Sequence, residues 1–261
     1  MPVHGKKTQF TGVIILTFTL TALVIKEKKM GEQDRLLTLL TAEMGVITAY
    51  AAGAGSIKSK KAAATRLLSY SDFTIDKKGE RMSITEASPI ELFFGVGSDV
   101  VTLALAQYFC EICLYITPPA GESAEILRLI LNSLYFITRG KKNIYQIKAI
   151  TELRLASVAG FMPDLTACSN CGDESENKTV YLSARDGCIV CENCRTGQGL
   201  IKLEPPLLNA MRHIVFSSFD KIYSFSLSSD LCVRLSEITE KYFEIQTEHR
   251  FKTLEFFNTV K

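Results

Sequence analysis

Five of the eight cysteines in this sequence lie within one stretch, residues 167–194. Its two ends repeat one tetrapeptide form, Cys168-Ser-Asn-Cys171 and Cys191-Glu-Asn-Cys194, with 19 residues (172–190) between the inner two cysteines. A Cys-x-x-Cys turn puts two sulfurs on one side of a tight bend, and two such bends supply the four thiolates that Zn²⁺ binds tetrahedrally. The spacing therefore predicts one structural zinc ion held by Cys168, Cys171, Cys191 and Cys194.

The segment between the two pairs explains how the bends would meet. Residues 180–183 and 188–190 are short runs of strand-forming residues, and Asp186-Gly187 between them is a strong hairpin signal. Cys188 complicates the ligand set, because Cys188-Ile-Val-Cys191 is also a Cys-x-x-Cys. We exclude it because both outer pairs carry Asn before the second cysteine, and Asn tolerates the positive φ of tight turns whereas Val190 does not. The pattern predicts a zinc ribbon in which Cys188 is a strand residue.

Other uses of these cysteines fit less well. Two disulfides would need an oxidising compartment, which nothing else in the sequence demands, and neither motif has the βαβ surroundings of a thioredoxin-like redox site. A catalytic zinc would need an open coordination position, whereas four thiolates close the site. We therefore favour a structural zinc.

Residues suited to catalysis are sparse elsewhere. The only histidines lie far apart in the sequence: His4, His213 and His249. A phosphate-binding loop is missing, because the residue before Lys58 is Ile57 where that motif needs Gly. Cys110 and Cys113 fall inside an apolar helical pattern, where core packing is the better explanation. The sequence predicts that the protein is not an enzyme.

Positive charge is concentrated toward the amino terminus. Residues 1–81 hold 13 Lys and Arg against 7 Asp and Glu, a net +6, and residues 82–261 hold 17 against 21, a net −4, which sum to the chain's +2. Candidate contacts for an anionic partner are Lys26, Lys28, Lys29, Arg35, Lys58, Lys60 and Lys61. With the aromatic side chains of Tyr50, Tyr70 and Phe73, they predict a surface that binds single-stranded nucleic acid through its phosphates and stacked bases.

The elements that must position these residues change in kind along the chain. Residues 21–88 contain five short apolar runs separated by glycines, which predicts a five-stranded barrel of the OB type. From residue 99 the apolar period becomes helical, with three helices before the cysteines and two or three after them. The predicted architecture is therefore a multidomain α+β protein whose all-helical domain is interrupted by the ribbon. The expected segments are an extension of unclear status at 1–20, the barrel at 21–88, helices at 89–166, the ribbon at 167–198 and helices at 199–261.

The apolar run at residues 10–25 has basic flanks, as an export signal would. It lacks an Ala-x-Ala-like cleavage site, is short for a membrane span and is rich in β-branched residues. We therefore expect strands here and a cytoplasmic protein.

The order of several motifs resembles the RecO family of bacterial recombination mediators. Gly31-Glu32 precedes Asp34-Arg35, Leu39-Leu40-Thr41 follows, and Gly160 with Pro163-Asp164-Leu165 leads into the first cysteine pair. The resemblance covers roughly residues 21–257, and we find no counterpart for the first 20 residues. One position departs from the family, because Gly53-Ala54-Gly55 stands where the family commonly has Gly-Ala-Arg.

This resemblance implies an amino-terminal OB-fold, a helical domain and, in many members, a four-cysteine zinc site. It implies a non-enzymatic DNA-binding protein of the RecF pathway that binds single- and double-stranded DNA and anneals complementary strands. Its implied partners are RecR, the single-strand-binding protein and, indirectly, RecA, which it helps to load onto coated single strands. A nucleoid-associated cytoplasmic location without a membrane partner follows from that role.

A zinc-ribbon protein that binds RNA or the ribosome is the alternative. Such a protein would carry positive charge around the ribbon. Residues 172–178, Gly-Asp-Glu-Ser-Glu-Asn-Lys, instead contain three acidic residues and one lysine. The ribbon itself is thus poorly suited to phosphate, which favours the recombination role.

Overall fold

The computed structural model describes all residues except 1–5, 11–12, 57, 119–120 and 175–176. Its contacts divide the chain into two compact units: residues 1–138 with 252–261, and residues 139–251. The helices that we expected in one domain are thus divided between both units. None of the described helices combines the length and the hydropathy needed to cross a bilayer.

The first unit begins with a six-stranded sheet. Its strands are β1 (Lys6–Phe10), β2 (Val13–Met30), β3 (Asp34–Thr41), β4 (Val46–Ala51), β5 (Ser69–Lys78) and β6 (Arg81–Leu92). The five predicted strands are confirmed, and β1 was not predicted. Strand β2 pairs with both β3 and β5, which closes the order β2-β3-β4-β6-β5 into a ring. The joint between β4 and β6 is one parallel pair, Tyr50 with Ser83, so the barrel is partly open, as in OB-folds.

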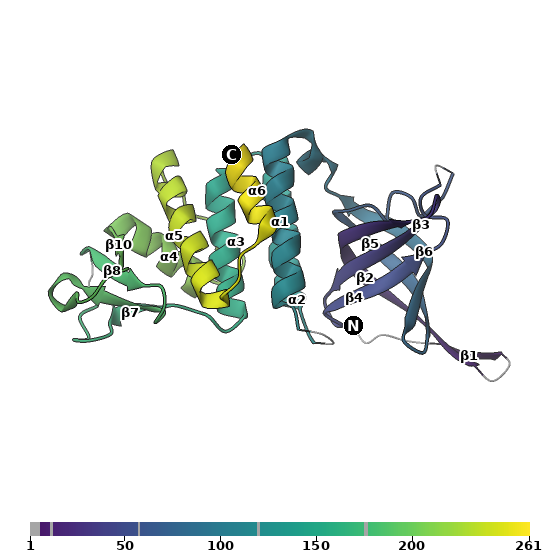
Figure 1. The fold of residues 1–261 in the computed structure, drawn as a ribbon, viewed down its shortest axis with the longest axis horizontal. Helices are drawn as coiled ribbons and strands as arrows, with labels where there is room; N and C mark the ends of the chain where they lie inside the picture. Colours follow the sequence, from purple (N-terminus) through teal and green to yellow (C-terminus); the bar gives the residue numbers. More distant parts are fainter. Residues whose placement is uncertain (1–5, 11–12, 57, 119–120, 175–176) are drawn as a thin grey trace. The chain divides into compact units, whose positions relative to one another are not determined.

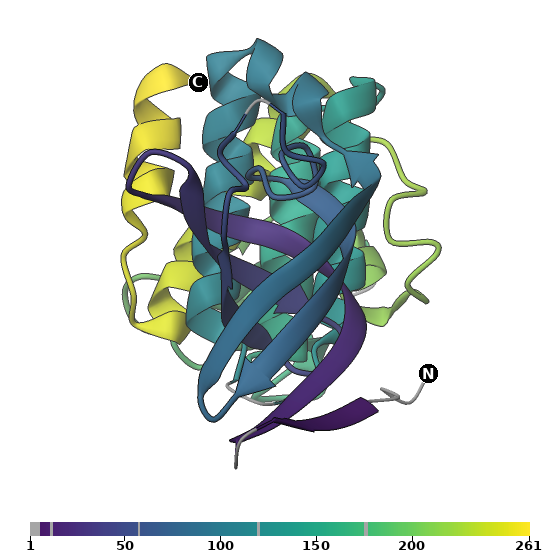
Figure 2. The same cartoon turned by 90° about the vertical axis from the view of Figure 1, so that its right-hand side faces the viewer.

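The length of β2 explains how one strand has two neighbours. Its first half pairs with β5 from Leu16 to Leu23, and its second half pairs with β3 from Ala22 to Met30 (Figure 1). Alternate side chains of β2 enter the barrel core, among them Phe18, Leu20 and Ala22. The amino-terminal apolar run is therefore a strand, and the expected extension at 1–20 needs correction because β2 already begins at Val13. Strands β5 and β6 form a long twisted hairpin (Figure 2).

Three helices complete the first unit: α1 (Val100–Ile116), α2 (Ala124–Arg139, whose last residue belongs to the second unit) and α6 (Lys252–Val260), preceded by the 3-10 turn η1 (Phe94–Ser98). Glu111 of α1 accepts hydrogen bonds from the backbone N–H groups of Lys252 and Thr253 at the start of α6, at 3.3 and 2.9 Å.

Burial raises the pKa of the Cys110 thiol to about 12. The prediction that Cys110 and Cys113 are core residues is confirmed, because both are buried.

The second unit combines three helices with a small sheet. The helices are α3 (Ile144–Val158), α4 (Pro205–Phe216) and α5 (Ser229–Thr247), and α3 packs along α5. The sheet has the order β10-β8-β9-β7, from β10 (Ile201–Leu203), β8 (Val180–Ser183), β9 (Cys188–Cys191) and β7 (Asp164–Cys168). The predicted hairpin is confirmed, since β8 and β9 pair antiparallel across a turn in which Gly187 has a φ of 68°. The outer strands β7 and β10 were not predicted.

Candidate metal centre and candidate nucleic-acid interface

The sulfur atoms of the two cysteine pairs gather at one end of this small sheet. Those of Cys168, Cys171, Cys191 and Cys194 all lie within 4.8 Å of one another. Sγ of Cys171 lies 3.8 Å from Sγ of Cys191. Four Zn–S bonds of about 2.3 Å in a tetrahedron separate their sulfurs by about 3.8 Å. The cluster therefore has the size and the ligand chemistry of a tetrathiolate zinc site.

Local backbone structure places each pair. Cys168 ends β7, and its carbonyl accepts a hydrogen bond of 2.9 Å from the N–H of Gly172, which closes the first turn. Cys191 ends β9, and the 3-10 turn η2 (Glu192–Cys194) follows it. Gly172 has a φ of 74°, whereas neither Asn of the two motifs is among the described residues with positive φ. Our argument from the conformation of Asn was therefore wrong, because the glycine after Cys171 supplies the left-handed residue.

Electrostatics in the cluster favour a bound cation. Burial of Cys168 raises its pKa, but backbone N–H groups of Cys191, Cys171 and Asn170 outweigh burial and lower it to about 6. The N–H of Cys191 lies 3.3 Å from Sγ of Cys168. Hydrogen bonds that the Cys194 thiol donates to the sulfurs of Cys171 and Cys191 raise its pKa to about 12, because four adjacent sulfurs cannot all ionise without a positive partner. A divalent metal supplies that charge.

Cys188 lies outside this group of four sulfurs. It pairs with Ser183 at the start of β9, as expected for a strand residue. The identity of the metal stays a prediction.

An arginine that the sequence did not single out ties the ribbon to α4. Arg212 donates hydrogen bonds to the carbonyl oxygens of Leu165, Thr166 and Glu174, at 2.7, 2.9 and 2.9 Å. Only the folded chain brings these residues together, since they lie 38 to 47 positions apart.

The candidate DNA-contacting lysines lie on the barrel in two groups. Those on the second half of β2 are exposed: Lys26, Lys28 and Lys29. In the connection between β4 and β5, Lys58 and Lys60 are exposed. Lys61 is half-buried, and its ammonium group donates to the carbonyl of Ile84 at 3.2 Å. Five of the six lysines thus present their charge to solvent.

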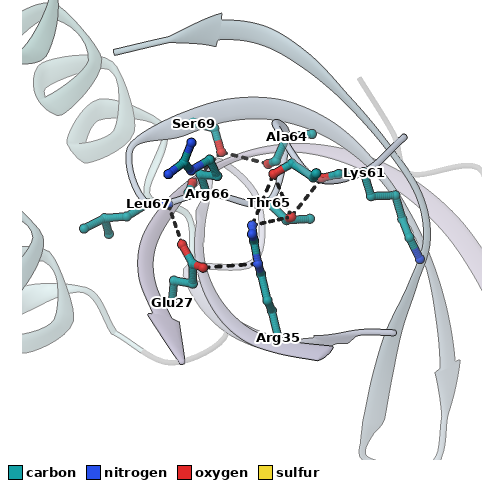
Figure 3. Close-up of polar contacts among 9 residues, drawn as sticks. Glu27, Arg35, Lys61, Ala64, Thr65, Arg66, Leu67 and Ser69 are labelled. Atoms are coloured by element: carbon teal, nitrogen blue, oxygen red, sulfur yellow. Dashed lines mark hydrogen bonds and ion pairs between the residues drawn. The ribbon is translucent and has the colours of Figure 1, made fainter. Parts of the chain in front are cut away.

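Arg35 differs from these lysines because its side chain is only 12% exposed. Nη1 donates to the carbonyl of Ala62 at 3.1 Å and to Oγ1 of Thr65 at 3.0 Å (Figure 3). Nε lies 3.1 Å from Oε1 of Glu27, an ion pair whose angle falls short of a hydrogen bond. Oε2 of Glu27 accepts from the N–H of Leu67 at 3.1 Å. The guanidinium group is therefore held inside the barrel's own structure.

The residues around Arg35 explain the motif in which it lies. Asp34 accepts hydrogen bonds from the N–H of Gly53 at 2.8 Å and from the hydroxyl of Tyr50, and both bonds lower its pKa. Gly55 donates to the carbonyl of Gln33 at 2.6 Å, and a Cβ on Gly55 would lie 3.0 Å from that oxygen. The close approach gives a reason for glycine where the family commonly has arginine.

The three aromatic candidates differ in exposure. Tyr50 is exposed, Tyr70 is half-buried, and Phe73 is buried in the barrel core. Phe73 is therefore a core residue and not a platform for a base.

A groove of about 960 Å³ crosses the barrel beside the second lysine group. Its lining includes Lys60 and Lys61 but also Glu43, Asp72 and Glu86. Three carboxylates against two ammonium groups do not suit a nucleic-acid backbone.

Comparison with known proteins gives a consistent result over nearly the whole chain. The sequence model described as "Recombination protein O N terminal" matches residues 15–93, and the one described as "Recombination protein O C terminal" matches residues 97–255. The first match begins before residue 21, so our view that the first 20 residues lack a counterpart holds only up to residue 14.

Curated relatives carry the same description, "DNA repair protein RecO". The protein from Acetivibrio thermocellus is 29% identical over 92% of this chain and 96% of its own length. The relative from Symbiobacterium thermophilum is 27% identical over 94% of this chain and 98% of its own. A relative from Dehalococcoides mccartyi is 28% identical over 85% of this chain and 86% of its own length.

Proposed function

Because this chain belongs to the RecO family of DNA repair proteins, we propose that it acts as a recombination mediator in the cytoplasm, at the nucleoid. In this role it binds single- and double-stranded DNA and anneals complementary strands. With RecR it helps to load RecA onto single strands that the single-strand-binding protein has coated.

One observation supports DNA binding most directly: five exposed lysines on the barrel, Lys26, Lys28, Lys29, Lys58 and Lys60. An ammonium group that neutralises a phosphate releases condensed counterions, and this release supplies most of the sequence-independent affinity. Such contacts fix the position of a strand without reading its bases. A mediator that works on any broken chromosome needs this kind of binding.

The proposed activity involves no catalysis by the protein. Strand annealing is driven by base pairing, so the protein needs only to bring strands together and to release the duplex. The sequence has no phosphate-binding loop, which agrees with a protein that hydrolyses no nucleotide.

We propose zinc as the ion of the four-cysteine cluster. Cys168, Cys171, Cys191 and Cys194 would hold it, and four thiolates leave no position for a substrate or a reactive water. The ion would therefore stabilise the ribbon and take no part in chemistry.

The proposal is tested by binding of a labelled single-stranded oligonucleotide across a salt series. We expect affinity to fall as salt rises, with a log-log slope of about −0.7 for each phosphate contact. Replacing Lys58 and Lys60 by Ala should make this slope shallower by about 1.4, the sum of two contacts. Lys61 is left in place because its ammonium group is bonded to the backbone.

A matched control removes two exposed lysines from the second unit, Lys178 and Lys202. We expect this variant to keep the wild-type slope. A wild-type protein that binds neither single- nor double-stranded DNA at low salt would refute the proposed function. Equal losses of DNA affinity in both double variants would show that binding depends only on the net charge of the protein.

A further inference from the structure

The connection that carries Lys58 and Lys60 is fastened to the barrel by an ion pair. We call residues 58–68 the lysine loop, and Glu27 with Arg35 the clamp. Arg35, on β3, bonds the loop at Ala62 and Thr65, and Glu27, on β2, bonds it at Leu67 (Figure 3). Their own contact of 3.1 Å joins these two attachments. The clamp therefore holds the loop at Ala62, Thr65 and Leu67, and the first of these attachments lies two residues after Lys60 and four after Lys58.

The clamped part of the loop is held by several further hydrogen bonds. Thr65 is fully buried, and its hydroxyl donates to the carbonyl of Lys61 at 2.8 Å while it accepts from Arg35. The carbonyl of Ala64 accepts from the hydroxyls of Ser69 and Ser71, at 2.8 and 3.0 Å.

The loop ends in a conformation that a side chain with a Cβ disfavours. Leu68 has a φ of 63°, and its N–H donates to the carbonyl of Val24 at 2.9 Å. A left-handed leucine persists only where the surroundings enforce it, and such positions concentrate at functional sites. The structure thus fixes this loop with more bonds than a solvated connection needs.

The clamp has no net charge, which argues against a direct role in binding phosphate. Arg35 is 12% exposed and Glu27 19% exposed, and each is the ionic partner of the other. Glu27 also lies between Lys26 and Lys28 in β2, where a carboxylate opposes binding of a polyanion. Its presence is explained if it holds the loop.

From these contacts we propose that Glu27 and Arg35 are positioning residues, which hold the lysine loop so that Lys58 and Lys60 meet the phosphates of a DNA single strand. This inference rests on the proposed function, because it concerns how the same surface binds DNA. It assigns Arg35 a different role from the direct contact that the sequence suggested.

Two substitutions separate positioning from simple electrostatics. Arg35→Lys keeps the positive charge but loses the planar group that reaches both Ala62 and Thr65, so positioning predicts a loss as large as that of Arg35→Gln. Glu27→Gln removes a negative charge from the barrel, so electrostatics alone predicts tighter binding. Positioning predicts weaker binding, because the ion pair is lost.

The experiment measures single-strand affinity across a salt series for Arg35→Gln, Arg35→Lys and Glu27→Gln. Each is made in the wild-type protein and in the Lys58→Ala/Lys60→Ala protein, as a double-mutant cycle. In the wild-type background we expect the slope to become shallower by up to about 1.4, which lowers affinity at 0.1 M salt by up to about 25-fold. In the lysine-less background we expect no further change, because the clamp has nothing left to position.

Controls of matched charge come from the tip of the β5–β6 hairpin, where Glu80 lies in the turn and Arg81 begins β6. Arg81→Gln and Glu80→Gln each change one exposed charge on the barrel, and we expect less than a twofold effect on affinity from either. Thermal melting checks that every variant is folded. If the Arg35 variants unfold, Thr65→Val tests the same attachment, because it removes one acceptor of Arg35 while it preserves the shape of the side chain.

Distinct results would overturn the inference. Wild-type affinity in Arg35→Lys beside a loss in Arg35→Gln would mean that Arg35 contacts phosphate itself. A clamp substitution that lowers DNA affinity equally in the wild-type and the Lys58→Ala/Lys60→Ala proteins would exclude positioning. Tighter DNA binding by Glu27→Gln would exclude it as well. A wild-type protein that binds no DNA would instead refute the proposed function.

Discussion

At the scale of single residues, neighbouring cysteines in one short strand have different roles. Cys188 begins β9 and Cys191 ends it, yet only Cys191 joins the group of four sulfurs. The difference follows from the strand, because Cys191 lies where the chain leaves the sheet toward the other pair, and Cys188 pairs with Ser183 within it. Position in the hairpin, and not the spacing of cysteines alone, decides which cysteine joins the group of four.

This selection predicts the metal content of two serine variants. Cys171→Ser should lose the ion and destabilise the ribbon, since metal binding by cysteines is coupled to folding. Cys188→Ser should keep one zinc per chain. Elemental analysis of the purified variants, together with thermal melting, measures both effects. A metal-free Cys188→Ser protein beside a metal-replete Cys191→Ser protein would show that the ligand set is wrong.

At the scale of elements, α3 and α5 are joined by buried charges. Lys148 of α3 is fully buried, and its ammonium group lies 2.8 Å from both Glu152 and Glu240. Glu152 also accepts a bond of 2.7 Å from the hydroxyl of Thr239 in α5. Burial of Lys148 excludes it as a contact for DNA. The charge instead fixes how the two helices pack.

Lys148→Ala should therefore destabilise the protein by about 3 to 5 kcal/mol, because it leaves Glu152 buried without its cation. Replacing both residues, in Lys148→Met/Glu152→Leu, should recover much of this loss. Denaturant unfolding of both variants gives the free energies. A free energy of unfolding for Lys148→Ala within about 0.5 kcal/mol of wild type would show that buried Glu152 does not depend on the Lys148 cation.

The same variant should respond to pH in a defined direction. Burial raises the pKa of Glu152 above its ordinary value of 4.5, although Lys148 and Thr239 act against this rise. A raised pKa in the folded state means that folding is favoured below the unfolded value and that this contribution is lost as pH rises. Removing Lys148 raises the pKa further. The deficit of Lys148→Ala relative to wild type should thus shrink between pH 7 and pH 5, and a deficit that grows would contradict this account.

At the scale of the whole molecule, the two candidate sites belong to different compact units. The lysines and the clamp lie in residues 1–138, and the four cysteines lie in residues 139–251. No residue is shared between the metal centre and the basic surface. The two sites should therefore be separable by experiment.

Removal of the metal by a chelator under reducing conditions tests this separation. We expect hydrogen exchange to increase across residues 164–194, because the ribbon loses its cross-link. The salt slope for single-stranded DNA should stay unchanged, and added zinc should restore slow exchange. A shallower slope after chelation would show that the second unit supplies phosphate contacts.

The sequence by itself determined most elements of this protein and the grouping of four cysteines that could hold a metal ion. The five barrel strands, three helices before the cysteines, two or three after them and the hairpin at Asp186-Gly187 follow from apolar periods and turn residues close together in the sequence, whereas β1, β7 and β10 were not predicted. The spacing of the two Cys-x-x-Cys motifs is local as well, although pairing of β7 with β9 is what brings Cys168 beside Cys191. Such features are local, so the order of residues contains them.

Only the tertiary structure decided which charged residues face solvent and which hold the fold. Arg35 and Lys148 look like other basic residues in the sequence, but their partners lie far away: Thr65 is 30 positions from Arg35, and Glu240 is 92 positions from Lys148. Whether a cation meets solvent or a carboxylate depends on strand register and helix packing, which bring distant segments together. The physical reason is that burial and pairing are properties of the folded chain, whereas charge alone is a property of the residue.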